Sequence, residues 1–399
     1  MPWMNGGVTA ALGFVAAGIH GGIKRGLKPD LALVRSESPS VAVGTLTTNR
    51  VKAPPIVISQ GRLRSGRADA VLLNSGCANC MTGAAGHQDA VQLSGAVARL
   101  LGLPAERILV ASTGIIGRRL PAPKLLRAIP NLVRAASRSG HANAARAILT
   151  TDQRIKEAAV EARLGGKLCR LGGMAKGAGM IAPSMATMLC VLTTDVKIEA
   201  AFARRLLREA VEQSFNRISV DGDMSTNDCV FLLANGRSGV SVRPGAPTAR
   251  QFARMLQAVT HRLAYLIVQD GEGATRVAAI QVAGARTDRE ALACARAVAT
   301  SSLVQTMLAS GDPNVGRIAS AAGASGVRFD PKRLAIQIGG HTAVARGVAR
   351  RIGKELAKQM FGSRDVTIRL DLGAGRGTAH MTTCDLTEAY VRINAFYPT

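Results

Sequence analysis

The sequence predicts an α/β fold with its strands in two layers, and three observations support this class. Apolar runs of strand type alternate along the chain with stretches in which apolar residues recur at helical spacing. Hydrophobic residues make up 47% of the 399 residues, enough for a sizeable core. Aromatic residues make up only 3%, so small aliphatic side chains must fill that core. We see no internal repeat, and a chain of this length is compatible with two or three subdomains.

The first half of the chain contains two strand and helix pairs in succession. The apolar runs at 71–74 and 108–112 predict buried strands, and amphipathic spacing predicts helices over 88–101 and 124–138. Further strands are expected at 188–194 and 229–234, with a helix over 199–214 between them.

The second half begins with a loop rich in Gly, Pro and Ser at 235–250, which contains a short strand and precedes a helix near 251–266. A new unit is expected to start after Gly284. Its elements, in order, are a helix over 288–309, a strand over 334–338, a helix over 349–360 and a strand over 366–372.

The formal net charge of +25, from 51 basic and 26 acidic residues, raises the question of a nucleic-acid partner. The basic residues are spread singly, without a block of five or six, and aromatic stacking platforms are nearly absent. We therefore favour a solvated, arginine-rich surface that suits anionic substrates, and we expect no nucleic-acid partner.

Seven cysteines, an odd number in a large chain, argue against a disulfide framework and for reduced thiols in a cytoplasmic protein. Cys77 and Cys80 form a C-x-x-C pair, but a zinc site needs a second pair of ligands, and only His87 lies close by. We therefore expect no metal and no redox role. The N-terminus lacks the basic region of a signal peptide, and no apolar run of about 18 residues occurs, so we expect no membrane segment.

The most informative stretch is residues 176–195, which reads KGAGMIAPSMATMLCVLTTD. A small residue followed by threonine at the edge of a buried strand, here Ala186-Thr187, suits a self-cleaving threonine nucleophile. The hydroxyl can attack its own preceding carbonyl, and the released amine can then serve the hydroxyl as a base. From the chemistry alone, the plainer alternative of a core strand with one small polar residue is favoured, because threonine is common in strands.

Other polar clusters follow the predicted strands. Thr113-Gly114 could offer a hydroxyl and an amide to one oxyanion, although an ordinary strand-to-helix turn is the alternative. The same ambiguity applies to residues 74–76 and 150–152. For residues 219–228 we favour a hydrogen-bonded turn over a cation site. Glu272 lies between two glycines, which indicates a carboxylate with a specific target. The glycines at 373–377 are not followed by a helical pattern and do not indicate a dinucleotide site.

Taken together, these motifs resemble the glutamate N-acetyltransferase family of arginine biosynthesis, also called ornithine acetyltransferase and in some members bifunctional. The similarity extends over residues 5–399. It is carried by GTLTTNRVKA (44–53), ASTGIIG (111–117), GGMAKGAGMIAPSMATML (172–189), SVDGDMSTND (219–228), DGEGAT (270–275) and CDLTEAYVRINAFYPT (384–399).

The resemblance implies a self-processing threonine-nucleophile acyltransferase fold, with a layered α/β/β/α core and a smaller C-terminal α/β domain. It implies self-cleavage between Ala186 and Thr187 into an α chain, 1–186, and a β chain. The β chain would comprise the rest of the core, 187–284, and the C-terminal domain, 285–399. Thr187 would be the nucleophile, and Thr113 and Gly114 would form the oxyanion hole.

The implied reaction transfers an acetyl group from N2-acetylornithine to glutamate by ping-pong kinetics through an acetyl-threonine. The implied substrate contacts are Thr150, Lys176, Thr187, Glu272, Asn394 and Thr399. The implied assembly is an α2β2 heterotetramer without cofactor or metal, and the use of acetyl-CoA as a further acetyl donor stays open.

The chain departs from the family pattern near these positions. Val315 and Thr382 replace usual tryptophans, the usual NSGNAN is NSGCAN, and the threonine pair continues as TTDQRIK. These departures therefore bear on the choice of substrate more than on the identity of the nucleophile. Two alternatives stay open: an aminopeptidase or amidase of the same self-processing fold, and a secondary-metabolism acetyltransferase with a different amine acceptor.

Overall fold

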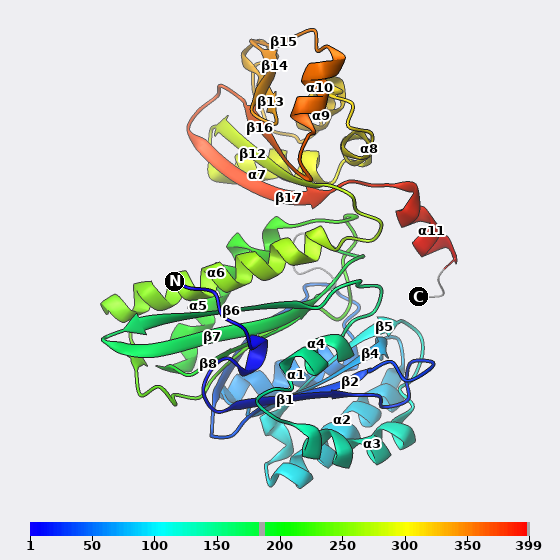
Figure 1. Ribbon diagram of the computed structural model, residues 1–399, viewed down its shortest axis with the longest axis vertical. Coiled ribbons are helices and arrows are strands. Elements are labelled where there is room, and N and C mark those ends of the chain that lie inside the picture. The colour runs from blue at the N-terminus through cyan, green and yellow to red at the C-terminus, as the bar shows by residue number, and fades with distance from the viewer. Residues whose placement is uncertain (183–187, 397–399) are drawn as a thin grey trace.

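The computed structural model describes residues 1–182 and 188–396. Ala186, Thr187 and Thr399 therefore lie outside the described residues. Two sheets form the core of the larger unit, and a third sheet forms a separate C-terminal unit (Figure 1).

The first sheet has four strands in the order β1-β2-β4-β5. These strands are β1 (Phe14–Ile19), β2 (Leu31–Ser36), β4 (Ala70–Cys77) and β5 (Ile108–Ile115). Only β4 and β5 pair in parallel; β1 with β2 and β2 with β4 are antiparallel. Its outer face packs on α2 (Gly83–Leu101) and α3 (Ala122–Ala135).

The second sheet has five strands in the order β3-β10-β8-β7-β6. These strands are β3 (Val41–Leu46), β10 (Cys229–Ala234), β8 (Leu189–Thr194), β7 (Lys167–Lys176) and β6 (Lys156–Leu164). Helices α5 (Ala200–Gln213) and α6 (Pro247–Gln269) cover its outer face. Every residue of β8 and β10 is buried, which explains why both strands read as unbroken apolar runs.

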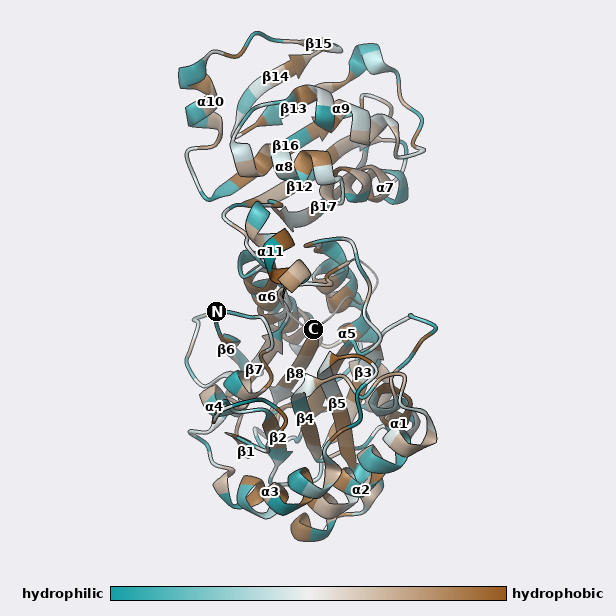
Figure 2. Cartoon of the chain, turned by 90° about the vertical axis from the view of Figure 1, so that its right-hand side faces the viewer, coloured by the Kyte–Doolittle hydropathy of each residue, from teal (hydrophilic) through white to brown (hydrophobic). Residues whose placement is uncertain are grey.

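The two sheets face each other across a shared apolar core that includes Phe14, Leu73, Leu109, Leu189 and Phe231. The layers therefore follow one another as α5 and α6, the five-stranded sheet, the four-stranded sheet, and α2 and α3 (Figure 1). In Figure 2 the strands of this core are coloured mainly as hydrophobic, whereas the outer helices alternate between hydrophilic and hydrophobic colours. The predicted α/β class with an α/β/β/α core is confirmed.

The C-terminal unit is built on a six-stranded sheet in the order β15-β14-β13-β16-β12-β17. The strands are β12 (Val277–Ala285), β13 (Ala335–Ile338), β14 (His341–Ala345), β15 (Val348–Ala349), β16 (Asp365–Asp371) and β17 (Gly377–Cys384). Its helices are α7 (Asp288–Ala299), α8 (Ser302–Ser310), α9 (Val315–Gly323) and α10 (Lys354–Met360). Because β12 pairs with β16 and β17, this unit begins at Val277 and not at the expected residue 285.

Two expected helices differ from the structure. The helix expected over 288–309 is two helices, because Ser301 lies between α7 and α8 and its side chain accepts the N–H of Val304 as an N-cap. The helix expected over 349–360 starts only at Lys354, since Val348–Ala349 form β15.

The remaining elements connect these layers. They are α1 (Pro54–Arg62), α4 (His141–Ala147), the two-stranded pair β9 (Lys197–Ile198) and β11 (Ser241–Val242), and α11 (Glu388–Phe396). Short 3-10 turns lie at Gly7–Thr9, Leu63–Ser65, Ala105–Arg107, Phe215–Arg217 and Pro331–Arg333. Among the described residues, no single helix is long and apolar enough to cross a membrane. The bent pair α7 and α8 meets that criterion by length and composition only.

Candidate functional site

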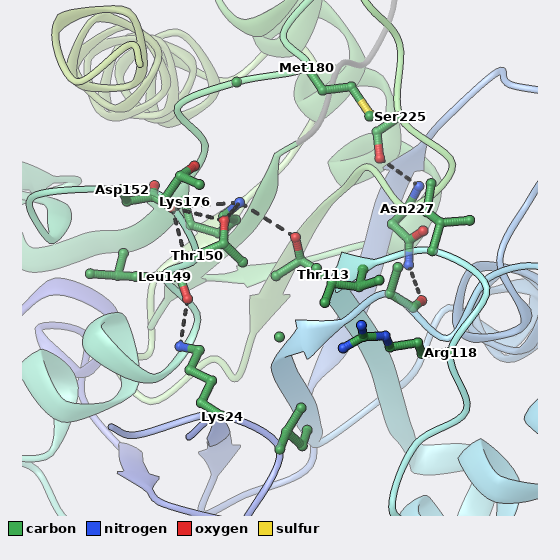
Figure 3. A pocket seen from close by; sticks show the side chains of 18 of the residues that line it. Lys24, Thr113, Arg118, Leu149, Thr150, Asp152, Lys176, Met180, Ser225 and Asn227 are labelled. Carbon is green, nitrogen blue, oxygen red and sulfur yellow. Dashed lines mark hydrogen bonds and ion pairs between the residues drawn. The ribbon is translucent and has the colours of Figure 1, made fainter. Parts of the chain in front are cut away.

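A cavity of about 780 Å³ opens where strand ends of the two core sheets meet (Figure 3). Its lining comes from segments far apart in the sequence, which include the ends of β5 and β7, the loop after α4, the loop before β10, and α11. Six of the predicted site residues line it, which are Thr113, Gly114, Thr150, Lys176, Glu272 and, from α11, Asn394.

Lys176 is the last residue of β7 and is only 2% exposed. Its Nζ donates a hydrogen bond to Thr150 Oγ1 at 2.7 Å and lies 3.5 Å from Thr113 Oγ1. The same ammonium lies 3.6 Å from Asp152 Oδ2. The structure thus brings two predicted site residues, Thr113 and Thr150, around the buried positive charge of a third, Lys176, as Figure 3 shows.

Asp152 joins this group to a second buried lysine. Lys156 Nζ lies 2.7 Å from Asp152 Oδ1 and 2.6 Å from Asp270 Oδ2. Burial alone would raise the pKa of the Asp152 carboxyl, but the ammonium groups of Lys176 and Lys156 outweigh it and hold that pKa well below its usual value. Asp152 is therefore a fixed negative charge that holds Lys176 in place.

Thr113 and Gly114 end β5 beside Gly76, the residue that pairs with Gly114 in β4. The φ of Gly114 is +127°, a conformation that side chains other than glycine rarely adopt. A Cβ atom at Gly114 would lie 2.4 Å from the carbonyl carbon of Gly76. Only glycine fits here, and it leaves the end of β5 open to the cavity.

Glu272 also lines the cavity and is buried. Its Oε2 accepts a hydrogen bond from Asn394 Nδ2 of α11 at 2.7 Å. Its own N–H donates to the carbonyl oxygen of Ala178, 2.9 Å away, and a Cβ atom at Gly179 would lie 2.5 Å from the carboxylate. The glycines of the AKGAG stretch thus let Glu272 approach the chain that leads from Lys176.

Lys24 reaches the cavity from the connection between β1 and β2. Its Nζ donates to the carbonyl oxygens of Leu149 at 2.7 Å and Pro29 at 3.0 Å. Burial lowers the pKa of Lys24 to about 8, and the charge of Lys176 adds to this effect, whereas Asp30 opposes it. Sequence analysis missed Lys24 because its partners are backbone carbonyl groups, which every residue has and which therefore form no sequence motif.

Lys156 and Asp270 were also missed as partners. Asp152 and Lys156 are four residues apart, which was the one available signal, but Lys156 and Asp270 are 114 positions apart in the chain. The sequence left open whether residues 150–152 form an ordinary turn or part of a site. This network of ion pairs places them in the cavity lining.

The polar stretch 219–228 uses its carboxylates on backbone N–H groups. Asp221 accepts the N–H groups of Met180 at 2.6 Å and Ile181 at 2.8 Å, and Asp228 Oδ1 accepts that of Met188 at 2.8 Å. These bonds support the favoured interpretation of a hydrogen-bonded turn. The turn holds the chain on both sides of residues 183–187.

Cys77 and Cys80 are both buried free thiols. Cys77 is the last residue of β4, and its Sγ lies 3.2 Å from the carbonyl oxygen of Arg118. Burial raises the pKa of the Cys77 thiol, which disfavours the thiolate that redox exchange requires.

Comparison with known proteins gives consistent matches over the whole chain. Residues 15–399 match the model of the ArgJ family. The arginine biosynthesis bifunctional protein ArgJ of Gloeobacter violaceus is 44% identical over 401 residues, covering 100% of this chain and 99% of its own. The chloroplastic ArgJ of Sorghum bicolor is 45% identical over 411 residues, covering 100% of this chain and 89% of its own.

A solved structure, that of ornithine acetyltransferase complexed with ornithine from Mycobacterium tuberculosis, is 43% identical. It covers 46% of this chain and 98% of its own, with a TM-score of 0.43.

Proposed function

This chain belongs to the ArgJ family, and we propose that it transfers the acetyl group of N2-acetylornithine to glutamate through an acetyl-threonine. The observation that carries the proposal is the placement of a buried ammonium, Lys176, and a buried carboxylate, Glu272, in the lining of one cavity. N2-acetylornithine has one free carboxylate and one free ammonium. Lys176 would bind the first and Glu272 the second, because each charge gains most from its partner where water is excluded.

In the proposed first half-reaction, the Thr187 hydroxyl oxygen attacks the acetyl carbonyl carbon, and the α-amino group of Thr187 takes the hydroxyl proton. The negative charge that forms on the carbonyl oxygen would be stabilised by the Thr113 hydroxyl and the Gly114 N–H. The carbon–nitrogen bond then breaks, and the proton passes from the α-amino group to the departing ornithine nitrogen. In the second half-reaction, the neutral α-amine of glutamate attacks the acetyl ester carbon, the ester carbon–oxygen bond breaks, and a proton passes from that amine by way of the Thr187 α-amino group to the threonine oxygen.

The same nucleophile would first be generated by self-cleavage. The Thr187 hydroxyl would attack the carbonyl carbon of Ala186, the peptide nitrogen would leave, and water would hydrolyse the resulting ester. An α-amino group with a pKa near 8 is partly neutral at pH 7 and can act as a base. The resulting α chain, 1–186, and β chain, 187–399, would stay associated, since β8 pairs with β7 on one side and β10 on the other.

Further parts of this proposal follow from the family alone. Thr399 would contact the substrate beside Asn394, and two cleaved protomers would form an α2β2 heterotetramer. The reaction needs no cofactor or metal, and the seven buried free cysteines suit a cytoplasmic enzyme.

We also propose that acetyl-CoA can serve as a second acetyl donor, which would make the chain bifunctional. The observation that favours this is the exposed group of basic side chains on the solvent side of the cavity lining, Arg25, Lys28, Arg118 and Arg146. Such a group suits the phosphates of coenzyme A. The cavity of about 780 Å³ also has a volume that suits a drug-sized molecule and not only an amino acid.

Isotope exchange tests the main proposal. Without glutamate, labelled ornithine should enter N2-acetylornithine, because an acetyl-enzyme forms and reverses, and with glutamate the product should be N-acetylglutamate. An aminopeptidase or amidase of the same fold would instead release acetate to water at a rate independent of glutamate. Release of acetate without exchange would therefore reject the transferase in favour of the hydrolase. A different amine acceptor would show as exchange with no N-acetylglutamate.

A further inference from the structure

The loop before β10 contacts both core sheets beside the cavity. Asn227 of this loop is 3% exposed and lines the cavity (Figure 3). Its Nδ2 donates to the carbonyl oxygen of Ala78 at 2.7 Å and to that of Ser112 at 2.9 Å. Ser112 directly precedes Thr113 in β5. Asn227 therefore holds the backbone that carries the two proposed oxyanion donors.

Asp228, the next residue, holds the start of β8. Its Oδ1 accepts the N–H of Met188 at 2.8 Å, and the N–H of Cys229 donates to the carbonyl oxygen of Met188 at 3.1 Å. Both backbone polar groups of Met188 are thus bound by residues 228 and 229. Met188 follows the proposed nucleophile in the sequence and is joined to it by a planar peptide unit.

The loop is itself held firmly. Thr47 Oγ1 donates to the carbonyl oxygen of Ser225 at 2.8 Å, and the N–H of Asn227 donates to Ser225 Oγ at 3.1 Å. Thr226 Oγ1 donates to Asn227 Oδ1 at 2.5 Å. With both amide hydrogens and the amide oxygen of Asn227 engaged, its side chain has one orientation.

We propose that Asn227 and Asp228 are positioning residues that hold the end of β5 and the start of β8 at a fixed separation. The inference rests on the proposed function, because that separation matters only if a nucleophile preceding Met188 works with Thr113 and Gly114. Asn227 acts through Ser112, and Asp228 acts through Met188.

The Asp228 carboxyl acts as a hydrogen-bond acceptor, and this role does not require a negative charge. Burial raises its pKa well above the usual value, against the opposing effects of the Met188 N–H and Lys176. Within residues 1–182 and 188–396, its Oδ2 has no hydrogen-bond partner. An asparagine at this position keeps the acceptor and the shape.

Asn227→Asp tests the first residue, because the variant keeps the shape but its carboxylate cannot donate to Ala78 and Ser112. We expect kcat for acetyl transfer to fall about 100-fold, the effect of a small misplacement of reacting groups, with little change in KM. The matched control is Asn235→Asp at the other end of β10, where Asn235 Nδ2 donates to the carbonyl oxygen of Leu12 at 2.8 Å and to Ser36 Oγ at 3.3 Å. This control should lower the melting temperature similarly and leave kcat unchanged.

Asp228→Asn and Asp228→Leu test the second residue. The asparagine variant should keep kcat within a few-fold of the wild type, whereas the leucine variant should lose about 100-fold. Equal kcat in the two asparagine-to-aspartate variants would overturn the role of Asn227. An Asp228→Asn variant as inactive as Asp228→Leu would overturn the role of Asp228. If the wild type itself transfers no acetyl group, the proposed function fails, which is a different result from these.

Discussion

Lys156→Met should destabilise the protein strongly, although Lys156 lies in no recognised motif. The Lys156 side chain is 1% exposed, and its ammonium bridges Asp152 and Asp270, whose side chains are 0% and 8% exposed. Methionine fills nearly the same volume without the charge. The variant therefore leaves two buried carboxylates without the cation between them.

Removing one partner of a buried ion pair costs about 3–5 kcal/mol, because the remaining charge is neither hydrated nor compensated. We expect a loss in this range for Lys156→Met. Adding Asp270→Asn should recover part of the loss, since it removes one of the two facing carboxylates. Lys156→Met, Asp270→Asn and the double variant together measure the coupling between Lys156 and Asp270.

The assay is urea unfolding followed by circular dichroism, carried out in a Thr187→Ala background so that each variant is a single uncleaved chain. The matched control is Lys358→Met, whose ion pair with Glu355 has a similar distance of 3.0 Å but side chains that are 75% and 81% exposed. An exposed pair contributes less than about 1 kcal/mol. If Lys156→Met lowers the free energy of unfolding no more than this control does, the buried network does not stabilise the fold.

Three further predictions concern the site and the joint between the units. Gly114→Ala should abolish self-cleavage, because its Cβ atom would lie 2.4 Å from the carbonyl carbon of Gly76. Gly117→Ala is the control, since Gly117 also has a positive φ but has open space around it, and it should still cleave. The band pattern on denaturing electrophoresis distinguishes the two variants. Glu272→Gln should raise KM for N2-acetylornithine about 10- to 100-fold, the loss of one charged hydrogen bond, and an unchanged KM would refute the ammonium contact. His261 and His380 stack at 6.2 Å, and burial lowers the pKa of both imidazoles below the unfolded value of about 6.5. The two neutral histidines contribute their full stability above about pH 6.5, and this contribution is lost as the pH falls through their pKa in the folded protein. His261→Gln should therefore flatten the acid side of a plot of melting temperature against pH.

Sequence analysis found β8 and β10, which are buried on both faces, and also β16, whose positions alternate between exposed and buried. The apolar runs of β8 and β10 have no exposed position, so their composition alone identified them. Strands β6 and β7 were missed because β6 reads KEAAVEARL, which has helix-forming residues, and β7 contains two glycines. They are strands because they pair with each other and β7 also pairs with β8, a tertiary effect that local propensity does not contain.

The candidate site likewise contains residues that the sequence predicted and residues that it did not. Thr113, Lys176 and Glu272 were predicted from a family resemblance, and the structure brings all three into one cavity. Lys156 and Asn227 were not predicted, because Asp270, the second partner of Lys156, is distant in the sequence and the partners of Asn227 are distant backbone carbonyl groups. Motifs identify side chains that contact substrate, whereas the contacts that hold them appear only in three dimensions.

We propose that Thr187 is both the cleavage site and the nucleophile. The most direct measurement is mass spectrometry of the denatured protein after mixing with N2-acetylornithine in the absence of glutamate. We expect two chains, 1–186 and 187–399, with one acetyl group on the first residue of the second chain, and a single unacetylated chain for Thr187→Ala. An uncleaved wild type, or an acetyl group on another residue, would contradict it.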